Sequence, residues 1–248
     1  MTMANLKYAL AVLFTLGLVS CSRKGEEARA CLSLNVSTCD ALADAVKSNV
    51  SQWVPLPAPE DFILTLRNGD NREVWKGKLE QWNTLNALLC GPYSVEASYG
   101  EDAGEGPGKP YFRGVHSFVL KSDTPLQSET VTVALANCVL RYEFTDAFKK
   151  CFSAWNFTIS TGSQNIFNLT ETVSEPIFID AFKFTLTGTI VGQNGVTATF
   201  GPMVYEDLKP ATCYLLRFDA SRSGSVATLA ISFDDSLEEV VVGEIELN

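Results

Sequence analysis

Apolar and polar residues alternate along most of this chain, and the alternation predicts β-strands. Leu32, Leu34 and Val36 are separated by Ser33 and Asn35, as expected of a strand with one buried face. The same pattern recurs in short segments separated by turn-forming Gly, Asn, Pro and Asp residues. The further predicted strands are 62–66, 73–75, 93–99, 115–121, 130–136, 138–144, 155–159, 166–169, 177–179, 182–190, 196–200, 214–218, 227–233 and 240–247.

Helical patterns are few. Thr145 before Asp146 is typical of a helix N-cap and predicts a short helix through Phe152, and 40–48 is compatible with another. The chain has no long amphipathic helix and no alternation of strands with helices. We therefore predict an all-β fold of two antiparallel β-sandwich domains (Ig/transthyretin-like), at 31–137 and 138–248, with one or two short helices.

The first 21 residues have a different pattern. Lys7 precedes an apolar run at 9–19, and the run ends in LVSC at 18–21. This resembles a bacterial lipobox and predicts a lipoprotein signal peptide at 1–20, a lipid-bearing Cys21 and a tether at 21–30. An ordinary secretory signal or a membrane helix are the alternatives, but the run is too short for a bilayer core. We expect attachment to the outer membrane through the lipid, at the cell surface or facing the periplasm.

Charge narrows the classes of partner. The chain has 19 Lys and Arg against 29 Asp and Glu, a formal net charge of −10. An acidic protein is a poor ligand for phosphate backbones, so we expect no nucleic-acid partner. The sequence also lacks a phosphate-cradling loop and a dinucleotide fingerprint, so we expect no cofactor.

The titratable residues give no catalytic pattern. His116, the one histidine, has no Gly-x-Ser-x-Gly elbow to accompany it, and we interpret it as a strand-surface residue. Pairs of carboxylates are too common here to indicate hydrolysis. The acidic runs at 101–105 and 234–239 lack EF-hand spacing, so we favour solvated turns over calcium sites. We predict that the protein is not an enzyme and has no metal site.

Six cysteines remain after Cys21. An exported compartment permits disulfides, but sequence cannot choose among the many possible pairings, and no Cys-x-x-Cys occurs. Small buried hydrophobes are the favoured interpretation. The six are Cys31, Cys39, Cys90, Cys138, Cys151 and Cys213.

Aromatic residues cluster in the loops and edges of the predicted first domain. Exposed rings could stack on sugars, whereas buried rings would cap the ends of a sandwich core. The sequence leaves both interpretations open. The candidate ligand-binding residues are Trp53, Trp75, Trp82, Tyr111 and Phe112, with Tyr99 in the same cluster.

Several segments resemble a known family. LCGPYSVEASYG at 89–100, GKPYFRG at 108–114, LANCVL at 135–140 and LKPATCY at 208–214 are similar to segments of uncharacterised two-domain lipoproteins of Bacteroidota, which are distantly fimbrillin-like with a transthyretin-like first domain. The resemblance covers about 31–220 and implies fold and location. It also implies free thiols at Cys90 and Cys138, where relatives often have a small residue.

The motif at 89–100 has structural roles in our interpretation. Gly91 permits a tight turn, Pro92 fixes φ before the strand, and Tyr93 buries its ring while its hydroxyl reaches a backbone carbonyl.

Two functions are compatible with these observations. The leading hypothesis is a non-catalytic surface lipoprotein that binds a glycan or protein ligand in adhesion. The alternative is a fimbrillin-like pilus subunit or pilus anchor that assembles with other pilus components by strand donation. Arg29, placed just before the first predicted strand, is a conceivable protease site for that route.

Overall fold

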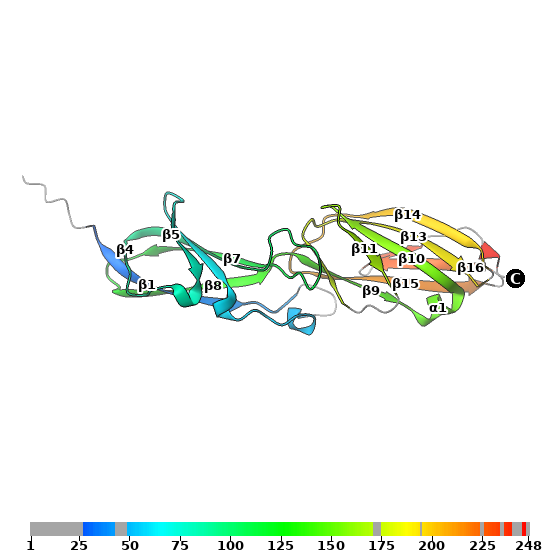
Figure 1. Ribbon diagram of the computed structural model, residues 1–248, viewed down its shortest axis with the longest axis horizontal. Helices are drawn as coiled ribbons and strands as arrows, with labels where there is room; N and C mark the ends of the chain where they lie inside the picture. The colour runs from blue at the N-terminus through cyan, green and yellow to red at the C-terminus, as the bar shows by residue number, and fades with distance from the viewer. Residues whose placement is uncertain are drawn as a thin grey trace, which may run out of the picture.

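The computed structural model describes residues 27–42, 49–170, 175–193, 195–223, 226–233, 236–239 and 245–246. The predicted signal peptide at 1–20 and Cys21 lie outside them, as do 43–48 of the second helix candidate and Asp234 and Asp235 of the second acidic run. The molecule is elongated, with Glu27 at one end and the hairpin of β15 and β16 at the other (Figure 1).

The fold is all-β, as predicted. The first half forms a sheet ordered β3-β2-β5-β7-β8-β1-β4. Its strands are β1 (Arg29–Thr38), β2 (Ile63–Asn68), β3 (Glu73–Lys78), β4 (Ala87–Leu89), β5 (Gly91–Tyr99), β7 (Phe112–Leu120) and β8 (Leu126–Leu135). Short 3-10 turns η1 (Val50–Gln52), η2 (Pro59–Asp61) and η3 (Leu79–Gln81) lie between them.

The second half contains two sheets. One is ordered β11-β10-β13-β14, with β10 (Phe152–Thr161), β11 (Ile166–Leu169), β13 (Phe184–Gly192) and β14 (Thr197–Tyr205). The other is ordered β17-β16-β15-β9-β12-β6, with β18 also on β16. Its strands are β6 (Gly106–Pro107), β9 (Cys138–Phe144), β12 (Ile177–Ile179), β15 (Cys213–Ser223), β16 (Val226–Phe233), β17 (Ser236–Glu239) and β18 (Ile245–Glu246).

The pairings are antiparallel, as expected of such sandwiches, except at two places. β1 runs parallel to β8, and β9 runs parallel to β15. In each half the chain continues from the first strand into other strands before a later strand pairs with that first strand in the same direction. Alternation of apolar and polar residues shows which face of a strand is buried but not the direction of its partner. Parallel strands need a long connection between them, and the intervening strands provide it here.

Aromatic rings fill the core of the second half. Phe157 of β10 stacks on Phe218 of β15 with ring centroids 4.3 Å apart, which joins the two sheets face to face.

The predicted short helix is confirmed as α1 (Asp146–Cys151), one residue shorter than expected. The Thr145 hydroxyl caps it by accepting from the Phe148 backbone N–H at 3.1 Å, and the fully buried Phe148 ring closes one end of the core.

The first strand begins earlier than predicted. β1 starts at Arg29, inside the proposed tether, because Arg29 pairs with Leu89 of β4 and its guanidinium donates to the Ala87 carbonyl at 2.9 Å. Arg29 is therefore part of a paired strand. A protease would have to separate β1 from β4 before cutting there.

Buried apolar side chains form two clusters that meet in the middle of the molecule. The first holds residues between Ala30 and Leu135 and also takes in Val139, Phe178 and Cys213 from further along the chain. The second begins at Cys138 and extends to Ile231. A short strand crosses between the halves, because β6 comes from a loop of the first half and pairs with β12 of the second.

Glu105, just before β6, fastens that loop to the second half. One carboxylate oxygen accepts from the Asn165 side-chain amide at 2.7 Å and from the Thr161 hydroxyl. The other accepts from the backbone N–H groups of Asp180 and Ala181 at 3.1 and 3.0 Å. The expectation of a solvated turn over 101–105 is therefore wrong for Glu105, whose hydrogen-bond acceptors are occupied by groups of the second half.

The charge of Glu105 matters to this attachment. Burial of the carboxylate alone would raise its pKa, but the four hydrogen bonds outweigh burial and lower the pKa below its ordinary value of 4.5. A group with a lowered pKa in the folded protein contributes stability above its ordinary pKa. That contribution disappears as the pH falls through the lowered pKa.

We predict that Glu105→Gln destabilises the protein by about 1–3 kcal/mol, because an amide turns a donor toward groups that themselves donate. Urea unfolding at pH 7 measures this. As the pH falls through the ordinary pKa of 4.5 and below, the wild type should lose the stability that ionised Glu105 contributes, whereas Glu105→Gln lacks that contribution at every pH. Glu101→Gln is the control, since Glu101 in the same loop is exposed and forms a surface ion pair with Lys109 at 3.1 Å. Equal destabilisation by the two substitutions would contradict the role given to Glu105.

Candidate ligand-binding site

A hollow of about 630 Å³ opens on the first half. Val54 and Pro55, which follow η1, form one wall. The other wall is made by the two ends of the loop that carries Glu105, at 99–101 and 108–110. This volume lies in the range of sites for small ligands.

Glycine allows the two ends of the loop to approach each other. Gly100 has φ +93°, and a Cβ there would lie 2.3 Å from the carbonyl oxygen of Pro110. Gly108 has φ +65°. Both backbone conformations are strained for other residues, so the shape of this wall depends on glycine.

Tyr99, the last residue of β5, presents the ring of the hollow. Its ring packs near Phe62 and Phe112, with centroids 5.9 and 6.4 Å away, and 37% of the residue is exposed. In the part of the chain that the structure describes, its hydroxyl has no hydrogen-bond partner. Tyr99 is thus a ring fixed by the core from behind and open to solvent in front.

The rim carries a charge pair. The Lys109 ammonium lies 3.1 Å from a carboxylate oxygen of Glu101, and both side chains are more than half exposed. Such a surface pair adds little stability, so a polar ligand can replace either partner at small cost.

Asn137 holds the loop from behind. This fully buried side chain accepts from the Tyr111 backbone N–H at 3.3 Å and donates to the Lys109 carbonyl at 2.9 Å. Its own backbone carbonyl accepts from the N–H of Ala211 at 3.0 Å. The wall of the hollow is therefore fixed by residues from both halves before any ligand arrives.

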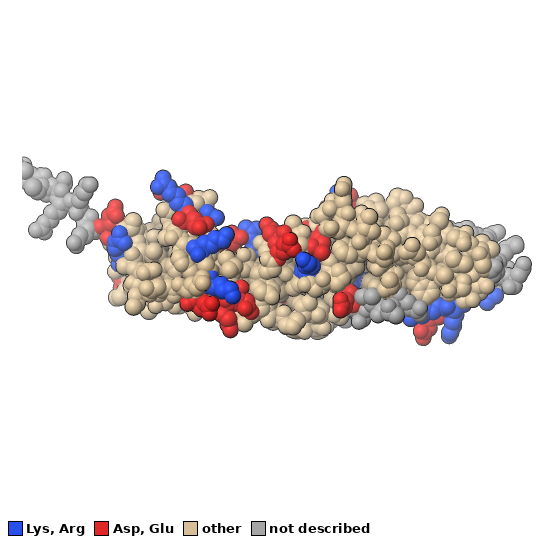
Figure 2. All heavy atoms as spheres, in the orientation of Figure 1, with Lys and Arg blue, Asp and Glu red and all other residues tan. Residues whose placement is uncertain are grey.

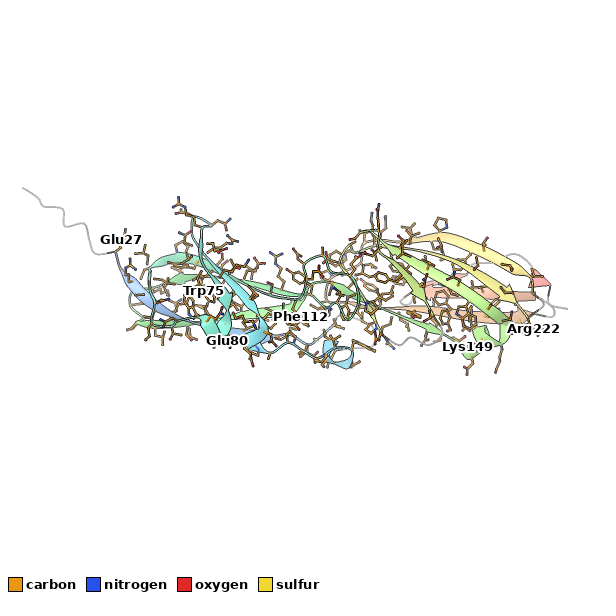
Figure 3. The ribbon with its side chains drawn as sticks, viewed as in Figure 1. Glu27, Trp75, Glu80, Phe112, Lys149 and Arg222 are labelled. Carbon is orange, nitrogen blue, oxygen red and sulfur yellow. The ribbon has the colours of Figure 1, made fainter. Side chains whose placement is uncertain are left out.

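Two of the predicted aromatics come together elsewhere. Trp75 on β3 meets Trp82 edge to face, with centroids 4.9 Å apart, and the indole N–H of Trp82 donates to the Leu32 carbonyl at 2.8 Å. Both are half-buried against the first cluster. Figure 3 shows Trp75 in the first half, away from Phe112, which lies near the middle of the molecule. These contacts favour the core-capping interpretation for this pair.

The other three predicted aromatics are also engaged. The guanidinium of Arg141 lies 4.3 Å above the Trp53 ring, so this half-buried ring contacts β9 of the second half. Phe112 is fully buried and Tyr111 is 7% exposed. The proposal that these two rings stack on a surface ligand is therefore wrong, because the core covers them. Tyr99 is the exposed ring of the cluster, and its position directly before a glycine at the end of a strand was the available signal.

The residues of the 89–100 motif make local contacts. Gly91 has φ +150°, and the Pro92 ring lies so close to Gly69 that a Cβ there would be 2.6 Å from its Cγ. The Tyr93 ring is buried and its hydroxyl donates to the Leu89 carbonyl at 2.8 Å.

All six described cysteines are free thiols. Cys138 is fully buried and its thiol donates to the Ile179 carbonyl at 3.4 Å. Burial raises the pKa of this thiol to about 12, which keeps it protonated and unreactive at neutral pH.

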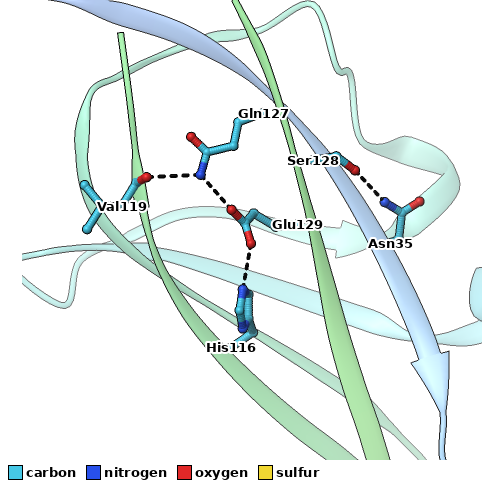
Figure 4. A network of polar contacts seen from close by, with 6 residues as sticks. All are labelled: Asn35, His116, Val119, Gln127, Ser128 and Glu129. Atoms are coloured by element: carbon cyan, nitrogen blue, oxygen red, sulfur yellow. Dashed lines mark hydrogen bonds and ion pairs between the residues drawn. The ribbon is translucent and has the colours of Figure 1, made fainter. Parts of the chain in front are cut away.

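His116 belongs to a seam between two strands, drawn in Figure 4. β7 and β8 pair only at Phe112–Leu135 and Arg113–Ala134, and they separate beyond that point. Side chains span the opening: His116 lies 2.7 Å from Glu129, and Gln127 donates to Glu129 and to the Val119 carbonyl. Burial opposes ionisation of Glu129, but the hydrogen bonds from Gln127 and His116 leave its pKa below its ordinary value.

The described residues offer neither a metal site nor a membrane-spanning helix. They contain no group of three or more His, Cys, Asp or Glu placed to hold a metal ion. None of their helices is both long and apolar enough to cross a membrane.

Residues 28–248 match a family model described as "Domain of unknown function (DUF4493)". The chain belongs to this family. No curated protein matches this DUF4493 chain. Among solved structures it is similar to a fimbrial assembly protein from Parabacteroides distasonis, at 11% identity and TM-score 0.48 over 85% of this chain and 99% of that one. It is also similar to a fimbrial anchor protein from Porphyromonas gingivalis, at 10% identity and TM-score 0.37 over 85% and 99%.

Proposed function

We propose that this DUF4493 protein is a non-catalytic surface lipoprotein that binds a glycan or protein ligand in adhesion, with the hollow around Tyr99 as its binding site. The observation that carries the proposal is the exposed Tyr99 ring, fixed by Phe62 and Phe112 in a cavity of ligand size. A ring held in place before binding costs little conformational entropy when a ligand settles on it.

The chemistry of the hollow suits a sugar. The C–H face of a pyranose can pack on the Tyr99 ring and on Pro55 and Pro110, which are apolar and rigid. Its hydroxyls can bond with the free tyrosine hydroxyl and with the exposed pair of Lys109 and Glu101. Walls that are mostly apolar, with a few placed polar groups, are typical of small-ligand sites.

The predicted lipid on Cys21 would place this site relative to the membrane. Glu27 lies at one end of the long axis, and Lys149 and Arg222 lie at the other (Figure 3). An anchor near Glu27 would hold the first half next to the bilayer and direct the second half outward. The hollow would then lie near mid-height, since Tyr99 packs near Phe112, which lies near the middle of the molecule (Figure 3).

Strand donation is the second candidate, and the seam between β7 and β8 favours it. Over most of their length these strands present unpaired backbone edges to one another, bridged only by side chains. An unpaired edge is a template for a strand from another chain. Cleavage after Arg29 is not suited to open this seam, because Arg29 pairs with β4 at the other side of β1.

Screening of the detergent-solubilised full-length protein against glycans and host-matrix proteins should find a ligand. Tyr99→Ala should then weaken binding by about tenfold or more, since the stacking surface is lost. Tyr99→Phe keeps the ring and should weaken it less. Thermal unfolding of both variants checks that the fold is intact. Absence of any ligand at high micromolar concentration, or equal affinity of Tyr99→Ala and wild type, would sink the proposal.

Lipidation is tested in cells fed an alkyne-labelled fatty acid. Wild-type protein should carry the label and sediment with membranes, whereas Cys21→Ala should be unlabelled. Cys31→Ala is the matched control and should remain labelled. Label that survives in the Cys21 variant would rule out this anchor.

Immunogold electron microscopy of bacteria that express a tagged copy decides between the two candidates. A shaft subunit would place gold along filaments, and a base or tip component would place it at filament ends. Gold confined to the cell body, with filaments present and unlabelled, would exclude the pilus role.

A further inference from the structure

The outer face of the sheet β3-β2-β5-β7 has a defined set of residues, given by its register. Leu64, Leu66, Val95 and Ala97 are fully buried, so the residues between them point outward. Across the sheet, Thr65 lies opposite Lys76 on one side and Glu96 on the other, and Glu96 lies opposite Val115.

Cations outnumber acids on this face. Arg67, Lys76, Lys78 and Arg113 occupy outward positions, against Glu73 and Glu96, in a chain whose net charge is −10. We call these four cations the basic face.

Most of these cations are not neutralised by the protein. The Arg113 guanidinium pairs with Glu96 at 2.7 Å. In the described part of the chain, Arg67, Lys76 and Lys78 have no ion-pair partner. Three unpaired cations on one exposed sheet face attract an anion.

Hydroxyl groups lie between the cations. Thr65, Ser94, Ser98 and Ser117 are outward residues of β2, β5 and β7. Lys78 and Arg113 are on strands three positions apart, about 14 Å at the usual strand spacing, and alternate residues of one strand are about 7 Å apart. The face therefore carries charged, hydroxyl and apolar side chains side by side, since Ile63 lies between Lys78 and Ser98 and Val115 lies beside Glu96. Its outward positions on these strands hold no aromatic ring on which nucleic-acid bases could stack.

Figure 2 shows the contrast between the halves. Lys and Arg surround the projecting hairpin of β2 and β3, with acidic side chains among and below them, while the second half presents a broad uncharged surface over β10, β13 and β14. In this view charged side chains of both signs gather on the first half, and the second half presents few.

We propose that the basic face binds an anionic polysaccharide, a carboxylated or sulfated glycan chain. The cations contact its carboxylates or sulfates, and the serine and threonine hydroxyls bond with its sugar hydroxyls. This site is separate from the hollow at Tyr99 and does not depend on the function proposed for it.

Detergent-solubilised full-length protein provides the test, with heparin as the sulfated probe, polygalacturonate as the carboxylated probe and dextran as the neutral one. At least one polyanion should bind, dextran should not, and affinity should fall between 50 and 200 mM NaCl. Lys76→Gln with Lys78→Gln should weaken binding by about tenfold, as loss of two charge-assisted contacts implies. The Tyr99→Ala variant should bind the polyanion unchanged.

Lys150→Gln with Lys183→Gln is the matched control, because it removes the same charge from the second half and should leave binding intact. A second variant, Ser94→Glu, adds a negative charge at the centre of the face and should also weaken binding, which guards against misfolding in any one variant. The proposal is overturned by no polyanion binding, by equal loss in the control, or by equally tight binding of single-stranded DNA or phosphatidylglycerol vesicles.

Discussion

The carboxylate of Glu105 is the interaction on which the arrangement of this protein depends. It satisfies four donors of the second half from a loop of the first, and it does so while partly removed from water. The same loop continues into β6, which adds a strand to the far sheet. Because the loop also forms a wall of the hollow, the attachment between the halves and the shape of the candidate site have a common cause. The hydrogen bonds of Glu105 and the β6–β12 pairing therefore hold the two halves together and also hold the wall of the hollow in place.

Much of the fold was accessible from the sequence because burial is a local signal. Alternation located most strands, and Thr145 with Asp146 located the helix. Strand direction was not accessible, because β1 and β8 look the same whether they run parallel or antiparallel. The seam between β7 and β8 was also hidden: its bridging residues His116, Gln127 and Glu129 read as ordinary strand positions. The division at 137 and 138 stays a prediction, and Val139 packs in the first cluster although it lies beyond that division.

The candidate site was predicted less well, for a different reason. An aromatic residue in a loop reads the same whether its ring is covered or open. Tyr111 and Phe112 are buried in the core, and the indole N–H of Trp82 donates to the backbone carbonyl of Leu32. Glu105 was grouped with its exposed neighbours because its four donors come from residues at least 56 positions away. Residues whose roles depend on distant partners are those that a single sequence leaves ambiguous.

The contacts between the halves have a mechanical consequence. The backbone passes from the first core to the second at Asn137, and a lone peptide connection of this kind would act as a swivel. Three further links lie away from it: the β6–β12 pairing, the Glu105 hydrogen bonds and the Arg141–Trp53 contact. These links would resist bending between the two halves when a sideways force, such as flow past a cell, acts on the molecule. The protein would transmit torque to its base and would not fold over at the middle.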